Sequence, residues 1–152
     1  MKLTTKGKFA VTALLDIALN STKRGDPITL WAISKRQGIS ISYLEQLFVK
    51  LRKNGMVSSY KGPGGGYILA RDLDKLNILD IIIAVDDSMD ASRCSGMRNC
   101  HDNKQCLTHD LWEDLTNHVN KYLNKVTLLD LIIRHEIKED NIERETQEIK
   151  FA

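Results

Sequence analysis

The chain has 152 residues, of which 42% are hydrophobic, and its formal net charge at pH 7 is +2. This length suits one domain, or a small domain with an appended element. The longest apolar run, residues 81–85, is far shorter than the roughly 18 residues of a membrane-spanning helix. Because no apolar leader opens the sequence either, we expect a cytoplasmic protein.

The two parts of the chain carry opposite charge. Residues 1–71 contain twelve Lys and Arg against three Asp and Glu, whereas the rest contains ten basic and seventeen acidic residues. A basic part joined to an acidic part is expected of a nucleic-acid-binding module linked to a second element. A basic half can also be no more than a solvated surface.

Apolar residues at helical spacing predict two helices at the start of the basic part. The first follows Thr4 or Thr5, either of which can cap it, and runs to Asn20. The second is capped by Thr29 and ends at Gly38, which can adopt a left-handed backbone.

A third predicted helix has two candidate first residues. Ser40 precedes the apolar stripe, while Ser42 and Glu45 have the spacing of a capping box. The turn before it is so short that the second and third helices together indicate a helix-turn-helix. Ser42, Tyr43 and Glu45 then lie in the first turns of a recognition helix, the part that enters the major groove. Alternatively, Tyr43 only packs on the helix surface and Glu45 only completes the cap.

The segment after the third helix predicts a wing. Strand-like runs at 56–60 and 67–70 flank the glycine-rich residues 61–66, which favours a hairpin. Its tip carries a basic residue, Lys61, that can reach the DNA backbone or minor groove. A phosphate-binding loop is disfavoured because no Lys-Ser or Lys-Thr follows the glycines and the loop leads into a strand.

All three cysteines lie close to a histidine in one loop, as Cys94, Cys100, Cys106 and His109. Three thiolates and an imidazole can bind an iron-sulfur cluster or a structural zinc ion. The five-residue gaps between the cysteines are wider than is usual for zinc ligand pairs, which favours a cluster without excluding zinc. Reduced thiols without a metal are a further alternative, and His101 could replace His109 as the fourth ligand.

Two more helices are expected around the cysteine loop. Asn77 opens a short apolar helix over 78–85, and a longer amphipathic helix after the loop has Leu111, Leu115 and Tyr122 on one face. We expect this face to pair with a second copy in a homodimer, since two-fold operators are read by two-fold proteins. The alternative is that the helix folds back on its own domain.

The fold class expected from these elements is mainly α with a small β-hairpin. We divide the chain into a winged helix-turn-helix domain (1–76), a segment with a helix, the ligand loop and the dimerisation helix (77–135), and a tail (136–152). The tail is mostly charged and has no clear apolar face, so we expect it to be disordered.

Several motifs in order resemble those of the bacterial iron-sulfur cluster regulators, a family of winged-helix transcription factors, over residues 1–133. Besides the cysteine loop, these motifs are Leu3-Thr4-Thr5-Lys6-Gly7-Lys8, Ser42-Tyr43-Leu44-Glu45-Gln46-Leu47, Leu51-Arg52-Lys53-Asn54-Gly55 and Gly62-Pro63-Gly64-Gly65-Gly66-Tyr67. The resemblance implies a homodimeric DNA-binding regulator with a 2Fe-2S cluster. Such regulators sense cluster supply and control the genes of cluster assembly, often by repression.

The resemblance also implies roles for particular residues. It makes Cys94, Cys100, Cys106 and His109 the cluster ligands, and it places Ser42, Tyr43, Glu45, Lys61 and Pro63 at the DNA. It further implies three partners, namely operator DNA, a second copy of the chain and assembly proteins that donate the cluster. The family's wing commonly begins with Arg, and Lys61 lacks the planar fork that suits a narrow minor groove.

Other classes of protein rank lower. A winged-helix regulator whose loop binds zinc, or senses nitric oxide or thiol oxidation, is the second interpretation. An enzyme or electron carrier is the third, because the histidines and carboxylates form no recognisable catalytic set.

Overall fold

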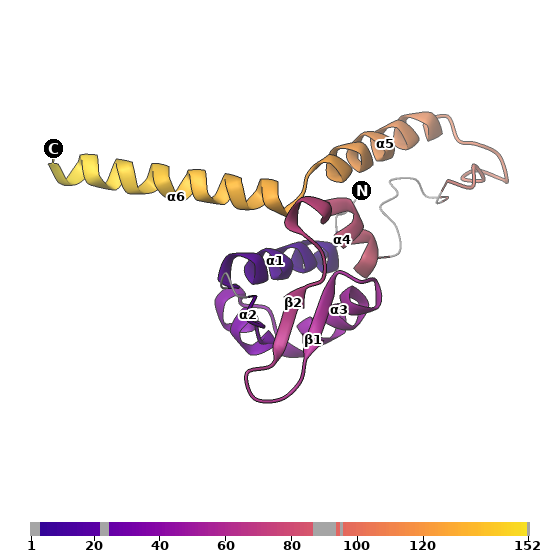
Figure 1. The fold of residues 1–152 in the computed structure, drawn as a ribbon. Coiled ribbons are helices and arrows are strands. Elements are labelled where there is room, and N and C mark those ends of the chain that lie inside the picture. The colour runs from indigo at the N-terminus through magenta and orange to yellow at the C-terminus, as the bar shows by residue number, and fades with distance from the viewer. Residues whose placement is uncertain (1–3, 22–24, 87–93, 95, 152) are drawn as a thin grey trace.

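The computed structural model describes residues 4–21, 25–86, 94 and 96–151, apart from the side chain at 151. Over these ranges the chain forms a helical body with a small antiparallel hairpin, and two further helices extend from that body (Figure 1). This is the mainly α architecture with a hairpin that the sequence predicts. None of the helices in these ranges is long and apolar enough to cross a membrane.

The first two helices begin and end at the residues that the sequence indicates. The Thr4 hydroxyl accepts a hydrogen bond from the Gly7 amide at 3.2 Å, and α1 (Thr5–Asn20) follows. Thr29 caps α2 (Leu30–Gln37) in the same way, and Gly38 ends it with φ of 67°. Side-chain oxygens at these positions satisfy amides that have no partner within the helix.

The third helix, α3 (Ile41–Lys53), begins after Ser40 rather than after Ser42. The Ser40 hydroxyl accepts from the Tyr43 amide at 3.3 Å, which settles the choice between the two serines. Because α3 follows α2 after a three-residue turn, the predicted helix-turn-helix is confirmed.

The hairpin consists of β1 (Val57–Tyr60) and β2 (Gly66–Leu69), paired antiparallel. Its base is attached to the segment before α2, since Ile28 and Tyr67 exchange backbone hydrogen bonds of 2.9 and 2.8 Å. A Cβ atom at Gly66 would lie 2.5 Å from the Ile28 carbonyl oxygen, so this close approach requires glycine. The wing therefore has a fixed base beside the helix-turn-helix.

The core joins α1, α3 and α4 (Ile78–Val85), with η1 (Leu73–Lys75) leading into α4. Its large side chains are fully buried, and each stabilises the fold by about 1.5–3 kcal/mol. They include Leu14, Ile17, Ile33, Leu44, Phe48, Leu51, Ile81, Ile82 and Leu128. Phe48 also packs edge-on against Tyr67 at 4.6 Å between ring centroids, which ties the wing to α3.

One buried ionic contact was not expected from the sequence. The Asp16 side chain is fully buried on α1, and Arg36 at the end of α2 donates to both of its oxygens, with Nη2 at 2.6 Å. Gln37 adds a hydrogen bond at 2.7 Å. The carboxylate in turn raises the pKa of Arg36 through their hydrogen bonds. These contacts fix α2 against α1.

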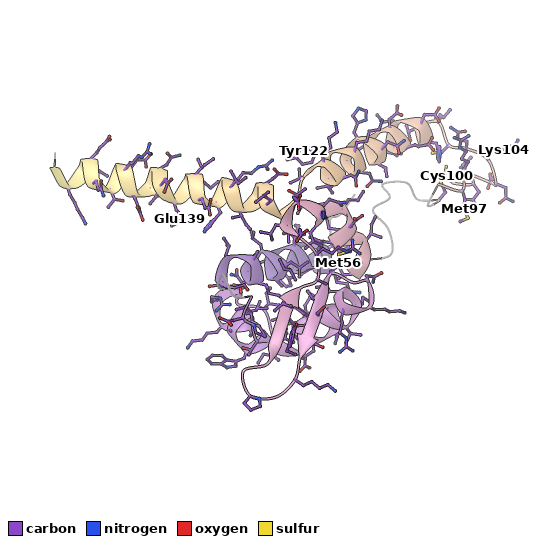
Figure 2. All side chains as sticks on the ribbon, viewed as in Figure 1. Met56, Met97, Cys100, Lys104, Tyr122 and Glu139 are labelled. Carbon is purple, nitrogen blue, oxygen red and sulfur yellow. The ribbon has the colours of Figure 1, made fainter. Side chains whose placement is uncertain are left out.

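The last two helices are α5 (His109–Lys125) and α6 (Leu128–Phe151), which extend in different directions from the body (Figure 1). The start of α6 is held beside the segment between η1 and α4, because the Leu128 amide donates to the Leu76 carbonyl at 2.9 Å. Figure 2 shows Tyr122 near the body and Cys100 at the far end of α5. The end of α5 near Tyr122 thus lies beside the body, with Leu123 packed against the core, while the start of α5 lies away from it.

The tail differs from the expectation of disorder at 136–152, because α6 continues as a helix through Phe151. Figure 2 shows Glu139 on this projecting part. The physical reason lies in the composition, since residues 134–150 contain no Gly or Pro and are rich in Glu, Lys, Arg and Ile. Asp140 and Arg144, four residues apart, also lie on one helix face with opposite charges.

Candidate functional site

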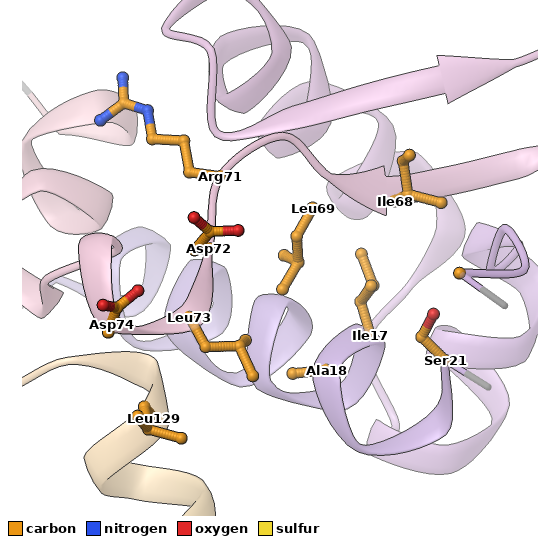
Figure 3. Close-up of a pocket in the computed structure, with 11 residues that line it drawn as sticks. Ile17, Ala18, Ser21, Ile68, Leu69, Arg71, Asp72, Leu73, Asp74 and Leu129 are labelled. Carbon is orange, nitrogen blue, oxygen red and sulfur yellow. The ribbon is translucent and has the colours of Figure 1, made fainter. Parts of the chain in front are cut away.

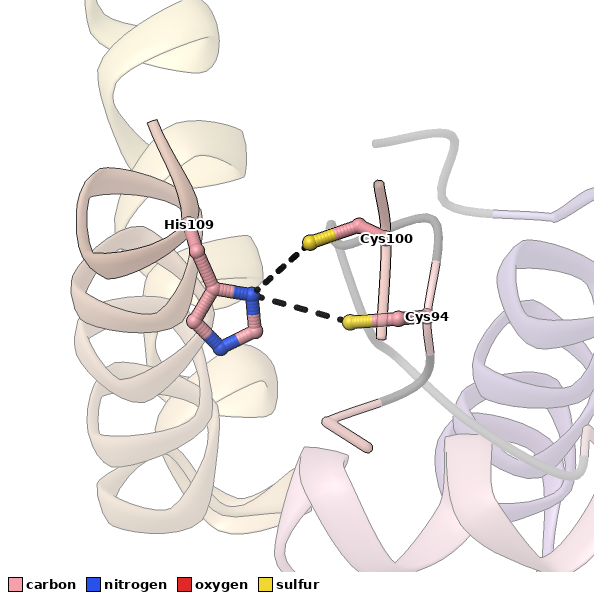
Figure 4. Close-up of side chains that lie close together, drawn as sticks. All are labelled: Cys94, Cys100 and His109. Carbon is pink, nitrogen blue, oxygen red and sulfur yellow. Dashed lines mark hydrogen bonds between the residues drawn. The ribbon is translucent and has the colours of Figure 1, made fainter. Parts of the chain in front are cut away.

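Three of the four predicted ligands come together at the start of α5. The Sγ atoms of Cys94 and Cys100 each lie 3.6 Å from Nδ1 of His109 (Figure 4). The three ligating atoms all lie within 4.8 Å of one another. His109 is only 1% exposed, and its Nε2 atom is buried without a hydrogen-bond partner in the described part of the chain.

The loop that carries the cysteines turns sharply on itself. Arg98, Asp102 and Asn103 all have positive φ angles of 45–58°, which are uncommon outside glycine. The Met97 amide donates to the Cys94 carbonyl at 3.0 Å and closes one of these turns. This folding brings the thiols back toward the first residue of α5.

Cys106 adjoins this group through Cys100. Its amide donates to the Cys100 sulfur at 3.2 Å, and its own Sγ lies 3.9 Å from Oγ1 of Thr108. The Cys106 sulfur is not one of the three ligating atoms that lie within 4.8 Å of one another. Its role as a ligand stays a prediction.

The two neighbouring thiols have opposite pKa shifts. The hydrogen bond from the Cys106 amide lowers the pKa of Cys100, but the Cys106 side chain, burial and Cys94 together outweigh it, so the pKa of Cys100 is raised. The hydrogen bond from the Cys100 side chain lowers the pKa of Cys106. Of these two thiols, Cys106 is therefore the more easily ionised.

His101, the competing candidate, lies apart from the thiols. Its backbone pairs with that of Lys104, its side chain is 79% exposed, and its imidazole is 3.8 Å from the Asp102 carboxylate. The fold thus brings His109, and not His101, to Cys94 and Cys100.

The chemistry of the converging donors fits a metal centre. Two thiols and an imidazole nitrogen are the ligand types that zinc and iron-sulfur clusters take. A thiol binds such a centre as a thiolate, and Cys106, whose backbone amide contacts the Cys100 sulfur, is the remaining cysteine. The donor types alone fit both kinds of centre.

The residues predicted to contact DNA lie on α3 and the hairpin. Ser42 and Glu45 are exposed in the first turns of α3, and Lys61 and Pro63 are exposed in the segment between β1 and β2. Tyr43 is half-buried because its ring packs edge-on against Phe9, with 5.6 Å between centroids. Tyr43 therefore contributes to packing, while the other side chains face solvent, and the DNA-contact roles of these residues stay predictions.

The end of α3 is attached to the end of α4, a contact that sequence patterns did not reveal. Lys50 donates to the Val85 carbonyl at 3.1 Å, and the side-chain Nδ2 of Asn54 donates to the Ala84 carbonyl at 3.2 Å. Arg71, after β2, donates to the Asn54 carbonyl at 3.2 Å. In the sequence, the pair Asn54-Gly55 indicates only the end of a helix and not a contact with α4.

A groove of about 710 Å³ lies between the end of α1, β2 and the start of α6 (Figure 3). Its wall combines Ile17 and Leu73 with Arg71, Asp72 and Asp74. Asp72 is paired with Lys75 at 3.1 Å. The described lining residues include no cysteine or histidine, so the groove is separate from the thiol group.

A helix-turn-helix followed by a hairpin with exposed basic and polar side chains defines a winged-helix DNA-binding regulator. The comparisons with known proteins then give the family. The chain belongs to the Rrf2 family, whose model, described as an iron-dependent transcriptional regulator, matches residues 3–134.

Among individual relatives, the HTH-type transcriptional regulator IscR of Escherichia coli is 53% identical over 137 residues, which cover 90% of this chain and 83% of the relative. Among solved structures, IscR of T. potens is 33% identical with a TM-score of 0.72 and matches 89% of this chain and 88% of its own. CymR, the global cysteine regulator of B. subtilis, has 29% identity, the same TM-score, and coverage of 86% and 95%. This chain is therefore a transcription regulator and not an enzyme.

Proposed function

We propose that this regulator senses iron-sulfur cluster status through a 2Fe-2S cluster bound by Cys94, Cys100, Cys106 and His109. It then controls genes of cluster assembly as a cytoplasmic homodimer that receives its cluster from assembly proteins. The observation that carries the proposal is the convergence of Cys94, Cys100 and the buried His109 within 4.8 Å. The 53% identity to IscR of E. coli supports it.

The donor set suits a cluster used for sensing. When bound, a 2Fe-2S cluster supplies a one-electron redox centre, and a histidine ligand raises its reduction potential. The Nδ1 atom of His109 lies 3.6 Å from both thiol sulfurs, which supports this nitrogen as the proposed ligand atom. Because His109 is almost fully buried, ligand exchange with water at this position is restricted.

DNA recognition divides between α3 and the wing. Ser42, Tyr43 and Glu45 are proposed to meet the bases, and Lys61 and Pro63 to meet the backbone or minor groove. Lys61→Met should weaken operator binding. It should also reduce the slope of the logarithm of the binding constant against the logarithm of salt concentration by about one, the loss of one phosphate contact. A salt slope equal to that of wild type would mean that Lys61 does not contact phosphate.

The apolar face of α5 supports the dimer. Leu111, Leu115 and Tyr122 are 59%, 38% and 57% exposed on one helix, which is unusual for large apolar side chains unless another surface covers them. A second copy of α5 would cover this face and place two recognition helices on a two-fold operator. Sedimentation that shows a monomer at micromolar concentration would contradict this part of the proposal.

The metal centre and the DNA surface are linked through α4. His109 is the first residue of α5, α5 packs against α4, and Lys50 and Asn54 of the recognition-helix end bind the last carbonyls of α4. An occupied centre would order the ligand loop and fix the start of α5. The orientation of the wings would then depend on occupancy.

The test combines metal analysis with DNA binding. Protein purified without oxygen should contain equal iron and sulfide, which Cys100→Ala and His109→Ala should lose and the matched control His101→Ala should keep. The cluster-loaded and cluster-free forms should differ in their preference among operators in footprinting. One tightly held zinc ion per chain without sulfide would instead favour the second candidate, a regulator with a structural zinc site.

A further inference from the structure

Thr108 occupies the position before α5 but does not cap the helix. At the starts of α1 to α4, a side-chain oxygen accepts a hydrogen bond from a backbone amide of the first turn; these residues are Thr4, Thr29, Ser40 and Asn77. Thr108 has φ of −108° and ψ of 11°, and its side chain makes no capping hydrogen bond. Threonine is a preferred capping residue, so its hydroxyl is used elsewhere.

The Thr108 hydroxyl lies between Trp112 and Cys106. The Trp112 Nε1–H group donates to Thr108 Oγ1 at 3.1 Å, and the same oxygen is 3.9 Å from the Cys106 sulfur. An indole nitrogen can only donate, so the Thr108 oxygen is the acceptor in that bond. The single hydroxyl hydrogen of Thr108 is not used in that bond, and the Cys106 sulfur lies within hydrogen-bonding distance of its oxygen.

We propose that Thr108 is a positioning residue of the metal centre, whose hydroxyl is oriented by Trp112 to donate a hydrogen bond to the Cys106 sulfur. This inference rests on the proposed function, because it assigns Cys106 to a bound 2Fe-2S cluster. Hydrogen bonds to ligand sulfurs are one of the factors that set a cluster's reduction potential. Reduction adds one electron to the cluster, and a donor at the thiolate stabilises the more negative reduced form.

The proposal predicts the direction of three substitutions. Thr108→Val removes the hydroxyl at nearly unchanged volume and should lower the reduction potential. Thr108→Ser keeps the hydroxyl and should restore the wild-type value. Trp112→Phe keeps an aromatic ring but removes the Nε1–H group that orients the hydroxyl, so its potential should lie between these two.

The experiment is a redox titration of the anaerobically purified full-length protein, followed by visible absorption at equilibrium with mediator dyes. Thr116→Val is the matched control, because Thr116 also lies on α5 and its hydroxyl donates to the Trp112 carbonyl at 2.8 Å. Thr108→Val should change the ratio of reduced to oxidised cluster about tenfold at a fixed potential, which is about 59 mV for one electron. Thr108→Ser and Thr116→Val should stay within about threefold of wild type.

Iron and sulfide analysis separates the outcomes. A cluster-loaded Thr108→Val protein with the wild-type potential would overturn this inference alone. A folded Thr108→Val protein that loses its cluster, while Thr108→Ser and Thr116→Val keep theirs, would support it through loss of Cys106 ligation. Wild-type protein without iron and sulfide would refute the proposed function, and this inference with it.

Discussion

Replacing Arg36 by Met should destabilise the helix-turn-helix strongly, because it leaves the buried Asp16 carboxylate without its cation. Asp16 has a side chain with 0% exposure, and Arg36 contacts both of its oxygens through Nε and Nη2 at 2.6–3.2 Å. Breaking a fully buried ion pair costs about 3–5 kcal/mol. Because the Arg36 side chain is 37% exposed, water screens part of the interaction, and we expect about 2–3 kcal/mol.

This loss is measured by chemical and thermal unfolding of the full chain at matched metal content. A cost of this size should lower Tm by about 5–10 °C for a chain of this length. Lys35→Met is the matched control, since Lys35 lies over the ring of Trp31 at 5.0 Å on the surface of α2. Adding Asp16→Asn to Arg36→Met removes the stranded charge and should recover part of the stability. An Arg36→Met protein as stable as the Lys35→Met control, or no recovery in the double variant, would refute the reasoning.

Glu45→Ala should relax the choice among operators without abolishing binding, because a carboxylate can accept a hydrogen bond from cytosine but is repelled by guanine acceptors. Unchanged relative affinities across operator variants would contradict this role of Glu45. The backbone and side-chain hydrogen bonds from Thr127 lower the pKa of Asp130. Ionised Asp130 therefore stabilises the start of α6 at pH values above its pKa of about 3.9 in the unfolded chain. This stabilisation is lost as pH falls through the lower pKa of Asp130 in the folded protein. Circular dichroism should show the stability difference between wild type and Asp130→Asn shrink at acid pH, and a constant difference would count against it. In metal-free protein the lowered pKa of Cys106 should make it react with iodoacetamide before Cys100, and equal labelling by mass spectrometry would argue otherwise.

Most of the fold could be predicted because its signals are local. Thr4, Thr29 and Asn77 precede apolar stripes of helical spacing, and Gly38 ends a helix where a left-handed residue is needed. The choice between two serines at α3 had no local solution, since both have capping sequences. In the structure α3 begins after Ser40, and the preceding Ile39 is buried in the core with 3% exposure. This burial depends on the packing of distant elements.

Contacts between distant residues could not be predicted in this way. Asp16 and Arg36 are twenty residues apart, and each alone is an ordinary charged residue of an amphipathic helix. The loop spacing predicted a thiol and histidine group, but only the fold distinguishes buried His109 from exposed His101. The tail could not be predicted for a different reason. A charged composition without an apolar face fits both a disordered segment and a solvated helix, and the structure has the helix.

The charge asymmetry of the sequence does not show which contacts join the basic and acidic parts of the chain. Lys50 belongs to the basic part, yet its ammonium group binds the Val85 carbonyl at the C-terminal end of α4, where the helix dipole is negative. Asn54 satisfies the neighbouring Ala84 carbonyl and, through its own carbonyl, binds Arg71 beyond the wing. A rotation of α4 would therefore pull on the recognition helix and the base of the wing together. Since α4 also packs against α5, which begins at His109, one short helix contacts both the recognition helix and the helix that carries a candidate metal ligand.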